Sequence, residues 1–188
     1  MESSIPSKLN TMGFEQICSS ENEVTEFIHN LKHKDHCIFV FEDEQIRDKV
    51  VNEFINLKTA KNILTACFST KPEKYDCNHQ ITYDKLVQEQ KLQPIVISDL
   101  LLNVLSESYQ KDQARIVCEE TSWLAENGMF DEHQKMGSEM DEKVFDESTI
   151  MCCYNASKLN DAQMDTVLSS RRYIILEKPF SVYEKKDF

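Results

Sequence analysis

The feature that most constrains the fold of this chain is the alternation of short, continuously apolar runs with segments of helical periodicity. The runs contain four to six residues each, which predicts strands buried on both faces, as parallel strands are. The segments between them carry apolar side chains three and four residues apart, as amphipathic helices do. The predicted strands are His36–Phe41, Ile63–Phe68, Ala114–Cys118, Thr149–Tyr154 and Tyr173–Leu176.

Residues that favour helix starts locate several of these helices. Ser20 and Glu23 form an S-x-x-E capping box, which predicts a helix over residues 20–32. Asn160 can cap a helix before the last strand, and Pro94 can open a long helix before the third strand. Three of the predicted helices therefore start at recognisable positions.

The segment 119–147 is rich in acidic residues and lacks a strand pattern. We expect it to contain a loop around Gly128 and a short helix capped by Ser138. In that helix Met140 and Val144 would face inward.

Strands that alternate with helices over the whole length predict a three-layer α/β domain with a mostly parallel central sheet. A chain of 188 residues suits one such domain. We expect an N-terminal extension over residues 1–19, a single domain over 20–180 and a frayed C-terminal tail over 181–188.

A shortage of glycine excludes most enzyme motifs. The chain has only three glycines, whereas Walker A loops, dinucleotide fingerprints and nucleophile elbows each need closely spaced ones. Carboxylates, at Glu42, Asp43 and Glu44, follow the first predicted strand where a phosphate loop would stand. The sequence therefore predicts no catalysis, no cofactor and no nucleotide binding, and leaves magnesium binding by these carboxylates as an alternative.

Charge and composition limit the partners and the compartment. The net charge of −12 argues against a nucleic-acid groove, which depends on neutralising phosphates. No apolar run reaches the length of a membrane span, and the N-terminal residues do not resemble an export signal. We therefore expect a cytoplasmic protein whose seven cysteines are reduced and mostly buried, with a redox pair at Cys152-Cys153 as a weaker alternative.

Three histidines near the first strand do not predict a metal site. His29 and His33 lie opposite the apolar stripe of their helix, so we expect them to face solvent. His36 belongs to the following strand, and its direction is set separately. The cysteines also lack a CxxC spacing, so no metal is expected.

The carboxyl ends of the strands are the expected binding edge of a parallel sheet. Adjacent residues at a strand end point in opposite directions, so we expect only one of the two glutamates there to face a pocket. The single tryptophan either lines that pocket or caps the core. The candidate ligand-binding residues are Glu119, Glu120, Trp123, Tyr154 and Asn155.

Several short motifs resemble the MEDS domain, the DcmR-type sensory family of methanogens and methylotrophs. The segment from Arg115 to Trp123 is similar to the family's R-apolar-x-G-E…W pattern, and Glu139 resembles its acidic helix position. Cys153-Tyr154-Asn155 resembles its C-x-Y-[DN] strand, and the strand that starts at His36 resembles its opening strand. The resemblance covers residues 34–179, with Cys118 where the family has glycine, and implies a RecA- or KaiC-like sensory fold without a nucleotide loop.

The leading functional hypothesis is a non-catalytic sensor or regulatory module that binds a small molecule or a signalling protein at the strand ends. A homodimer is one form in which such a module could act. The alternative is a small enzyme or a degenerate ATPase-like protein that retains nucleotide affinity. Because His36 starts its strand, we expect it at the edge opposite the site.

Overall fold

The computed structural model describes residues 4–57, 62–108, 113–141 and 148–187. Ten strands form one large sheet and one small hairpin among these residues. The large sheet contains β1 (Phe14–Cys18), β2 (His36–Phe41), β3 (Ile63–Ser69), β4 (His79–Thr82), β7 (Gln113–Cys118), β8 (Thr149–Asn155), β9 (Tyr173–Leu176) and β10 (Ser181–Lys185). The hairpin pairs β5 (Val87–Gln88) with β6 (Lys91–Leu92).

The strand order in the large sheet is β1-β10-β9-β2-β8-β7-β3-β4. From β9 to β4 every neighbouring pair is parallel, and only β10 and β1 at one edge run antiparallel. Each of the five predicted strands is present, and β2 lies in the interior of the sheet between β9 and β8. The predicted α/β architecture with a mostly parallel sheet is confirmed.

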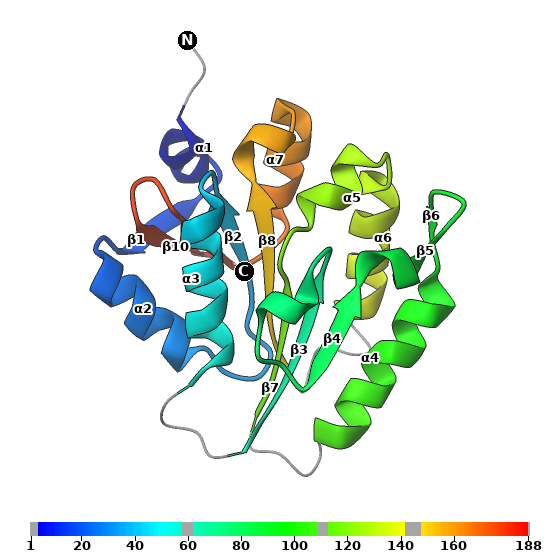
Figure 1. Ribbon diagram of the computed structural model, residues 1–188. Helices are drawn as coiled ribbons and strands as arrows, with labels where there is room; N and C mark the ends of the chain where they lie inside the picture. Colours follow the sequence, from blue (N-terminus) through cyan, green and yellow to red (C-terminus); the bar gives the residue numbers. More distant parts are fainter. Residues whose placement is uncertain (1–3, 58–61, 109–112, 142–147, 188) are drawn as a thin grey trace.

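Helices cover both faces of this sheet (Figure 1). Residues of α2 and α3 pack on one face, and residues of α1, α4, α5, α6 and α7 pack on the other. Side chains of each central strand alternate between the two layers, as in β2, where Ile38 and Val40 face one core and Cys37 and Phe39 the other. The helices are α1 (Ile5–Thr11), α2 (Glu21–Asn30), α3 (Glu44–Ile55), α4 (Pro94–Ser108), α5 (Ser122–Glu126), α6 (Phe130–Asp141) and α7 (Asp161–Ser169).

The predicted helix starts at Ser20, Pro94 and Asn160 are confirmed. Ser20 and Glu23 form a reciprocal capping box at α2, and Asn160 forms another with Gln163 at α7. Pro94 is the first residue of α4. No helix among the described residues has both the length and the apolar character needed to cross a membrane.

Buried Arg115 joins both helices of one layer to the sheet. Its guanidinium donates to the backbone carbonyls of Ile28, His29 and Leu31 at the end of α2, and of Phe54 near the end of α3. The nitrogen–oxygen distances of these four hydrogen bonds are 2.9–3.2 Å. Burial lowers the pKa of Arg115 to about 10. The role of this residue is therefore to satisfy the free carbonyls of two helix ends, not to bind a ligand.

The predicted frayed tail over residues 181–188 is wrong for 181–185, which form β10. This strand pairs with β9 on one side and with β1 on the other, so it also draws residues 14–18 of the predicted extension into the sheet. Val182 and Tyr183 are buried on opposite faces, one in each core. Charged residues at 184–186 and the short length of the segment hid this pattern in the sequence.

The acidic segment also differs from its prediction. Gly128 does lie in a loop, with a φ of +73°, but the helix after it is α6, which starts at Phe130. Ser138 is inside α6 and donates to the carbonyl of Gln134, so it is not a cap. The positions of the Met140 side chain and of Val144 are outside the described residues.

Removal of residues 181–188 should lower the free energy of unfolding by about 3 kcal/mol or more, because two buried side chains and the partner of both β9 and β1 are lost. Urea unfolding monitored by circular dichroism measures this loss. Removal of residues 187–188 alone serves as the control and should leave the midpoint unchanged. Equal midpoints for both truncations would contradict the assignment of β10 as a structural strand.

Candidate functional site

Two consecutive glutamates lie at the carboxyl end of β7, and both are buried. Glu119 and Glu120 are 2% and 7% exposed. Arg47 of α3 forms ion pairs with both, at 2.8 Å to Glu119 Oε1 and 2.9 Å to Glu120 Oε2. Lys158 also pairs with Glu120. The expectation that the two glutamates point in opposite directions is wrong, because the chain turns directly after Cys118 and both side chains reach Arg47.

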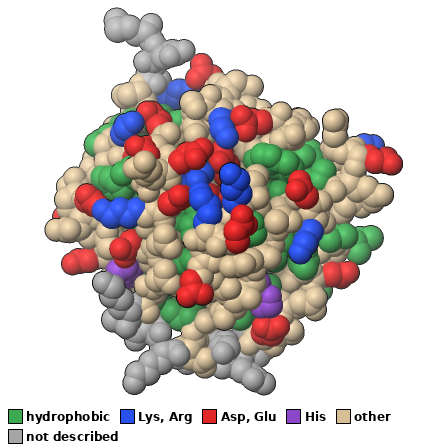
Figure 2. All heavy atoms as spheres, viewed as in Figure 1, with side chains coloured by type: hydrophobic (Ala, Val, Ile, Leu, Met, Phe, Trp, Pro, Cys, Tyr) green, Lys and Arg blue, Asp and Glu red, His purple; other side chains and the backbone are tan. Residues whose placement is uncertain are grey.

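Hydrogen bonds extend this ion cluster to a loop after β3. The hydroxyl oxygen of Tyr75 lies 2.7 Å from a carboxylate oxygen of Asp48 and 3.0 Å from one of Glu119. Its single proton can be donated to either carboxylate. Burial acts to raise the pKa of Asp48, but hydrogen bonds from Tyr75, Arg47 and Lys74 outweigh it and lower that pKa. Burial opposes the charge on Arg47, whereas the carboxylate of Glu119 raises its pKa. The ion pairs of Asp48 with Arg47 and Lys74 join this network to the glutamates (Figure 2 shows Lys and Arg side chains surrounded by Asp and Glu near the centre of this face).

The turn between β2 and α3 is also occupied by a carboxylate of the chain itself. Glu177, at the end of β9, accepts hydrogen bonds from the backbone amides of Glu42 and Asp43 at 2.6 and 2.9 Å. In phosphate-binding proteins, amides at such a turn point at the phosphate. Here Glu177 takes that place, and Arg47 in the following helix is held by Glu119 and Glu120. The strand-end region is thus filled by internal ion pairs.

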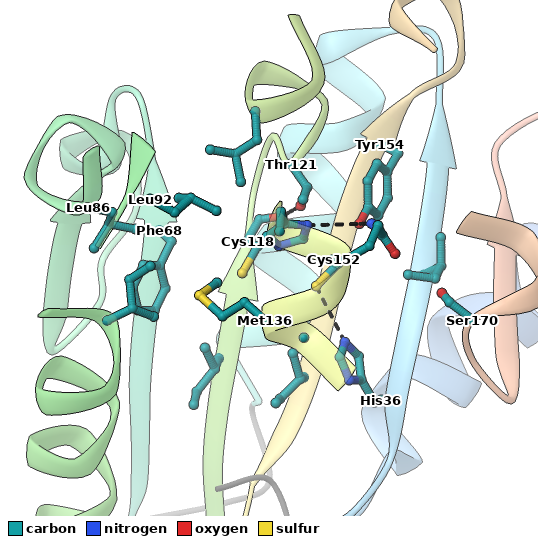
Figure 3. A pocket seen from close by; sticks show the side chains of 18 of the residues that line it. His36, Phe68, Leu86, Leu92, Cys118, Thr121, Met136, Cys152, Tyr154 and Ser170 are labelled. Carbon is teal, nitrogen blue, oxygen red and sulfur yellow. Dashed lines mark hydrogen bonds between the residues drawn. The ribbon is translucent and has the colours of Figure 1, made fainter. Parts of the chain in front are cut away.

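A cavity lies on the opposite face of the sheet, between the strands β2, β3, β7 and β8 and the helices α4 and α6 (Figure 3). Its volume is about 80 Å³. Most of its wall is apolar, with Phe68 and Ile116 from the sheet and Leu101 and Met136 from the helices. A buried space of this kind, walled mainly by apolar side chains with a few polar groups, is typical of small-molecule sites.

Polar groups gather at one wall of this cavity. Cys118 and Cys152 are direct neighbours in the register of β7 and β8, and His36 Nε2 lies 3.4 Å from Cys152 Sγ (Figure 3). A hydrogen bond from Cys118 lowers the pKa of Cys152, and the nearby His36 lowers it further. Burial of the Cys152 thiol acts in the opposite direction but is outweighed. Burial lowers the pKa of His133, which also lines the cavity. None of the described lining residues is Asp or Glu.

The predicted site residues are divided between the two regions. Glu119 and Glu120 belong to the ion cluster, whereas Tyr154 lines the cavity and accepts a hydrogen bond from Gln134 at 3.2 Å. Asn155 accepts from the Ser157 amide and caps a short 3-10 turn over residues 156–158. The five candidates therefore do not form one crevice.

Trp123 combines parts of both predicted roles. Its ring stacks on Tyr83, with centroids 5.5 Å apart and an interplanar angle of 6°. Trp123 is only half-buried and does not itself line the cavity, whereas Tyr83 does. Trp123 covers the ring of a cavity residue.

The structure clarifies the positions of two residues, His36 and Cys153, that resemble motif positions of the MEDS family. His36 starts the interior parallel strand β2, at the edge opposite the predicted strand-end site as expected, but its side chain lines the cavity. Cys153 packs in the opposite core, and it is Cys152 that faces His36. The C-x-Y-[DN] spacing from Tyr154 already fits Cys152, a signal in the sequence that the choice of Cys153 missed. Glu139 belongs to α6, and its side chain is outside the described residues.

Within the described part of the chain, no group of three His, Cys, Asp or Glu side chains could hold a metal ion. His29 is half-buried and pairs with Glu53 at 2.7 Å, so it does not simply face solvent as expected.

No protein-family model and no curated protein matches this chain. A solved structure from Pyrococcus horikoshii OT3, described as a structural study of Project ID PH0250, is similar over 81% of this chain and 86% of that one, with 10% identity and a TM-score of 0.56. Flagellar accessory protein FlaH from Methanocaldococcus jannaschii aligns over 86% and 79% at 13% identity with a TM-score of 0.45. The cytoplasmic domain of EssC aligns over 77% and 31% at 16% identity with a TM-score of 0.43.

The Pyrococcus structure supports the fold alone. This chain has the three-layer α/β fold with a mostly parallel sheet that the sequence predicts.

The substitution Arg47→Met should lower the free energy of unfolding by about 3–5 kcal/mol, because it leaves two buried carboxylates without their countercharge. Chemical denaturation measures the loss. The triple variant Arg47→Met, Glu119→Gln, Glu120→Gln removes the unpaired charges as well and should recover most of it. A loss below about 1 kcal/mol in the single variant would show that the network is not a structural constraint.

Proposed function

We propose that this chain is a non-catalytic, cytoplasmic sensor or regulatory module that holds a small molecule in the cavity between the sheet and helices α4 and α6. Occupancy of the cavity would be passed to a signalling protein or to a second copy of the chain. The observation that carries the proposal is the cavity itself, which combines apolar walls with a few polar groups in an otherwise close-packed core. The resemblance of the His36 strand and the C-x-Y-[DN] strand to the MEDS family adds support, since both contribute to this wall.

The residues that line the cavity, and the two layers from which they come, favour a regulatory role over catalysis. The polar wall of the cavity contains thiols, imidazoles, phenols, an amide, hydroxyls and a guanidinium, and the described lining residues include no Asp or Glu that could bind a metal ion. The lining comes from both the sheet and the helices α4 and α6, so a bound molecule contacts two layers at once. Binding would therefore change the packing of α4 and α6 on the sheet, which supplies a signal without a reaction.

A size test at one helix separates a ligand site from a passive packing defect. Leu101 of α4 lines the cavity, and its neighbour Leu102 is 53% exposed. Leu101→Phe should fill the space and abolish ligand binding, whereas Leu102→Phe adds the same volume on the solvent side. Mass spectrometry of small molecules released from protein purified from its native cells should find a stoichiometric compound with wild type and Leu102→Phe.

The same compound should be absent from Leu101→Phe. Equal amounts in all three preparations would place the ligand elsewhere, and the lack of any specific compound in wild type would oppose the sensor proposal. Circular dichroism and unfolding midpoints of both variants control for folding.

The alternative, a degenerate ATPase-like protein with residual nucleotide affinity, follows from the RecA- or KaiC-like fold that the MEDS resemblance implies. Against it stand the carboxylate of Glu177 on the amides of Glu42 and Asp43, and the saturated ion pairs of Arg47. A triphosphate would have to displace these groups and overcome their charge.

Calorimetric titration with magnesium-ATP and magnesium-GTP should therefore give no specific heat of binding. The thermal midpoint should also stay constant, although a ligand at 100 times its Kd would stabilise the protein by about 2.7 kcal/mol. A stoichiometric isotherm in the micromolar range would favour the ATPase-like alternative.

A further inference from the structure

A buried hydroxyl of a cavity-lining residue lacks a hydrogen-bond partner among the described residues. The hydroxyl of Tyr83 is buried and has no hydrogen-bond partner among the described residues, and the residue as a whole is 2% exposed. Burial without an acceptor raises the pKa of this phenol, so it carries its proton. An unsatisfied buried hydroxyl costs about 1–3 kcal/mol and calls for an explanation in a native fold.

Packing holds the Tyr83 ring in place. The ring stacks in parallel on Trp123, and Tyr83 begins the 3-10 turn Tyr83–Leu86, whose last residue also lines the cavity. The hydroxyl therefore cannot reach solvent by a simple rotation of the side chain, because the ring would leave the stack. An acceptor must come to the hydroxyl.

Two other residues of the cavity wall, Tyr154 and Arg171, add further donors. The Tyr154 hydroxyl uses a lone pair to accept from Gln134, which leaves its proton for another acceptor. Arg171, whose Nη1 donates to the carbonyl of Ser170, adds a positive charge to the wall. With no Asp or Glu among the described lining residues, no carboxylate of the wall is available to accept from these donors.

We infer that the cavity binds a small, mainly apolar molecule that carries an sp² oxygen, as a carbonyl or a carboxylate, and that this oxygen accepts the hydrogen bond of Tyr83. The inference rests on the proposed function and names the chemical class of its ligand. Tyr83 is then the specificity-determining residue, and Trp123 keeps it in position.

The volume limits the size of this molecule. A water needs about 10–15 Å³ of such space, so 80 Å³ corresponds to roughly five to eight non-hydrogen atoms. A short-chain or small cyclic carbonyl compound fits this limit, whereas a nucleotide or a long fatty acid does not. The apolar walls would contact the hydrocarbon part of the ligand, and the donor wall would contact its oxygen.

Three probes of equal size separate the possible ligand types. Cyclopentanone carries a carbonyl, isobutyrate carries a carboxylate, and methylenecyclopentane replaces the carbonyl oxygen by carbon. Calorimetric titration of the full chain should show that cyclopentanone or isobutyrate binds at least tenfold more tightly than methylenecyclopentane. The preferred oxygen probe identifies whether the ligand is neutral or anionic.

The variant Tyr83→Phe keeps the ring and removes only the hydroxyl. It should abolish the tenfold preference for the oxygen probe and leave the affinity for methylenecyclopentane unchanged. Without any probe, its unfolding midpoint should equal or exceed that of wild type, because an unsatisfied buried group is removed. Tyr173→Phe is the matched control: Tyr173 lies on β9, packs on Phe27 and is outside the cavity, so its variant should keep the preference.

Two results would overturn the inference without affecting the proposed function. One is equal affinity of wild type for all three probes, and the other is a preference for oxygen that survives Tyr83→Phe. A lower midpoint of unliganded Tyr83→Phe would also overturn it, since the hydroxyl would then have a partner in the protein. Failure of all three probes to bind would reject the cavity as a ligand site, and the proposed function with it.

Discussion

Arg47 connects the helix that follows β2 to the two carboxylates that follow β7. The guanidinium and both carboxylates are removed from water, and such a group can be left unpaired only at a cost of several kcal/mol. The pairs therefore fix α3 against the end of β7 and keep the carboxyl edge of the sheet closed. Glu177 closes the neighbouring turn in the same way by accepting from two backbone amides.

Closure of this edge explains why the cavity is found on the other face. Side chains of β7 alternate between the layers, so Val117 packs under α3 while Cys118 reaches the cavity. The chain then turns, and Glu119 and Glu120 both reach Arg47. β7 and the turn after it thus contribute to both the ion cluster and the cavity. Because the core is close-packed, β7 and β8 transmit a change in the packing of one helix layer to the other layer.

Two arginines with similar burial have different tasks in this fold. Arg115 meets only backbone carbonyls, which have no partners at helix ends, and so it stabilises the packing of α2 and α3. Arg47 meets carboxylates and so decides the chemistry of the strand ends.

The sequence by itself determined the five central strands, the capped starts of α2 and α7 and the absence of a phosphate loop. Each of these follows from neighbouring residues: a short apolar run, a capping box, or a lack of glycine. Only the tertiary structure decided the remaining features, because they join residues far apart in the chain. β10 forms because β9 and β1 both offer it an edge, Arg47 finds Glu119 across 72 residues, and Cys152 meets His36 across a parallel register. The unsatisfied hydroxyl of Tyr83 is also invisible in the sequence, since a missing hydrogen bond exists only once every neighbour is in place.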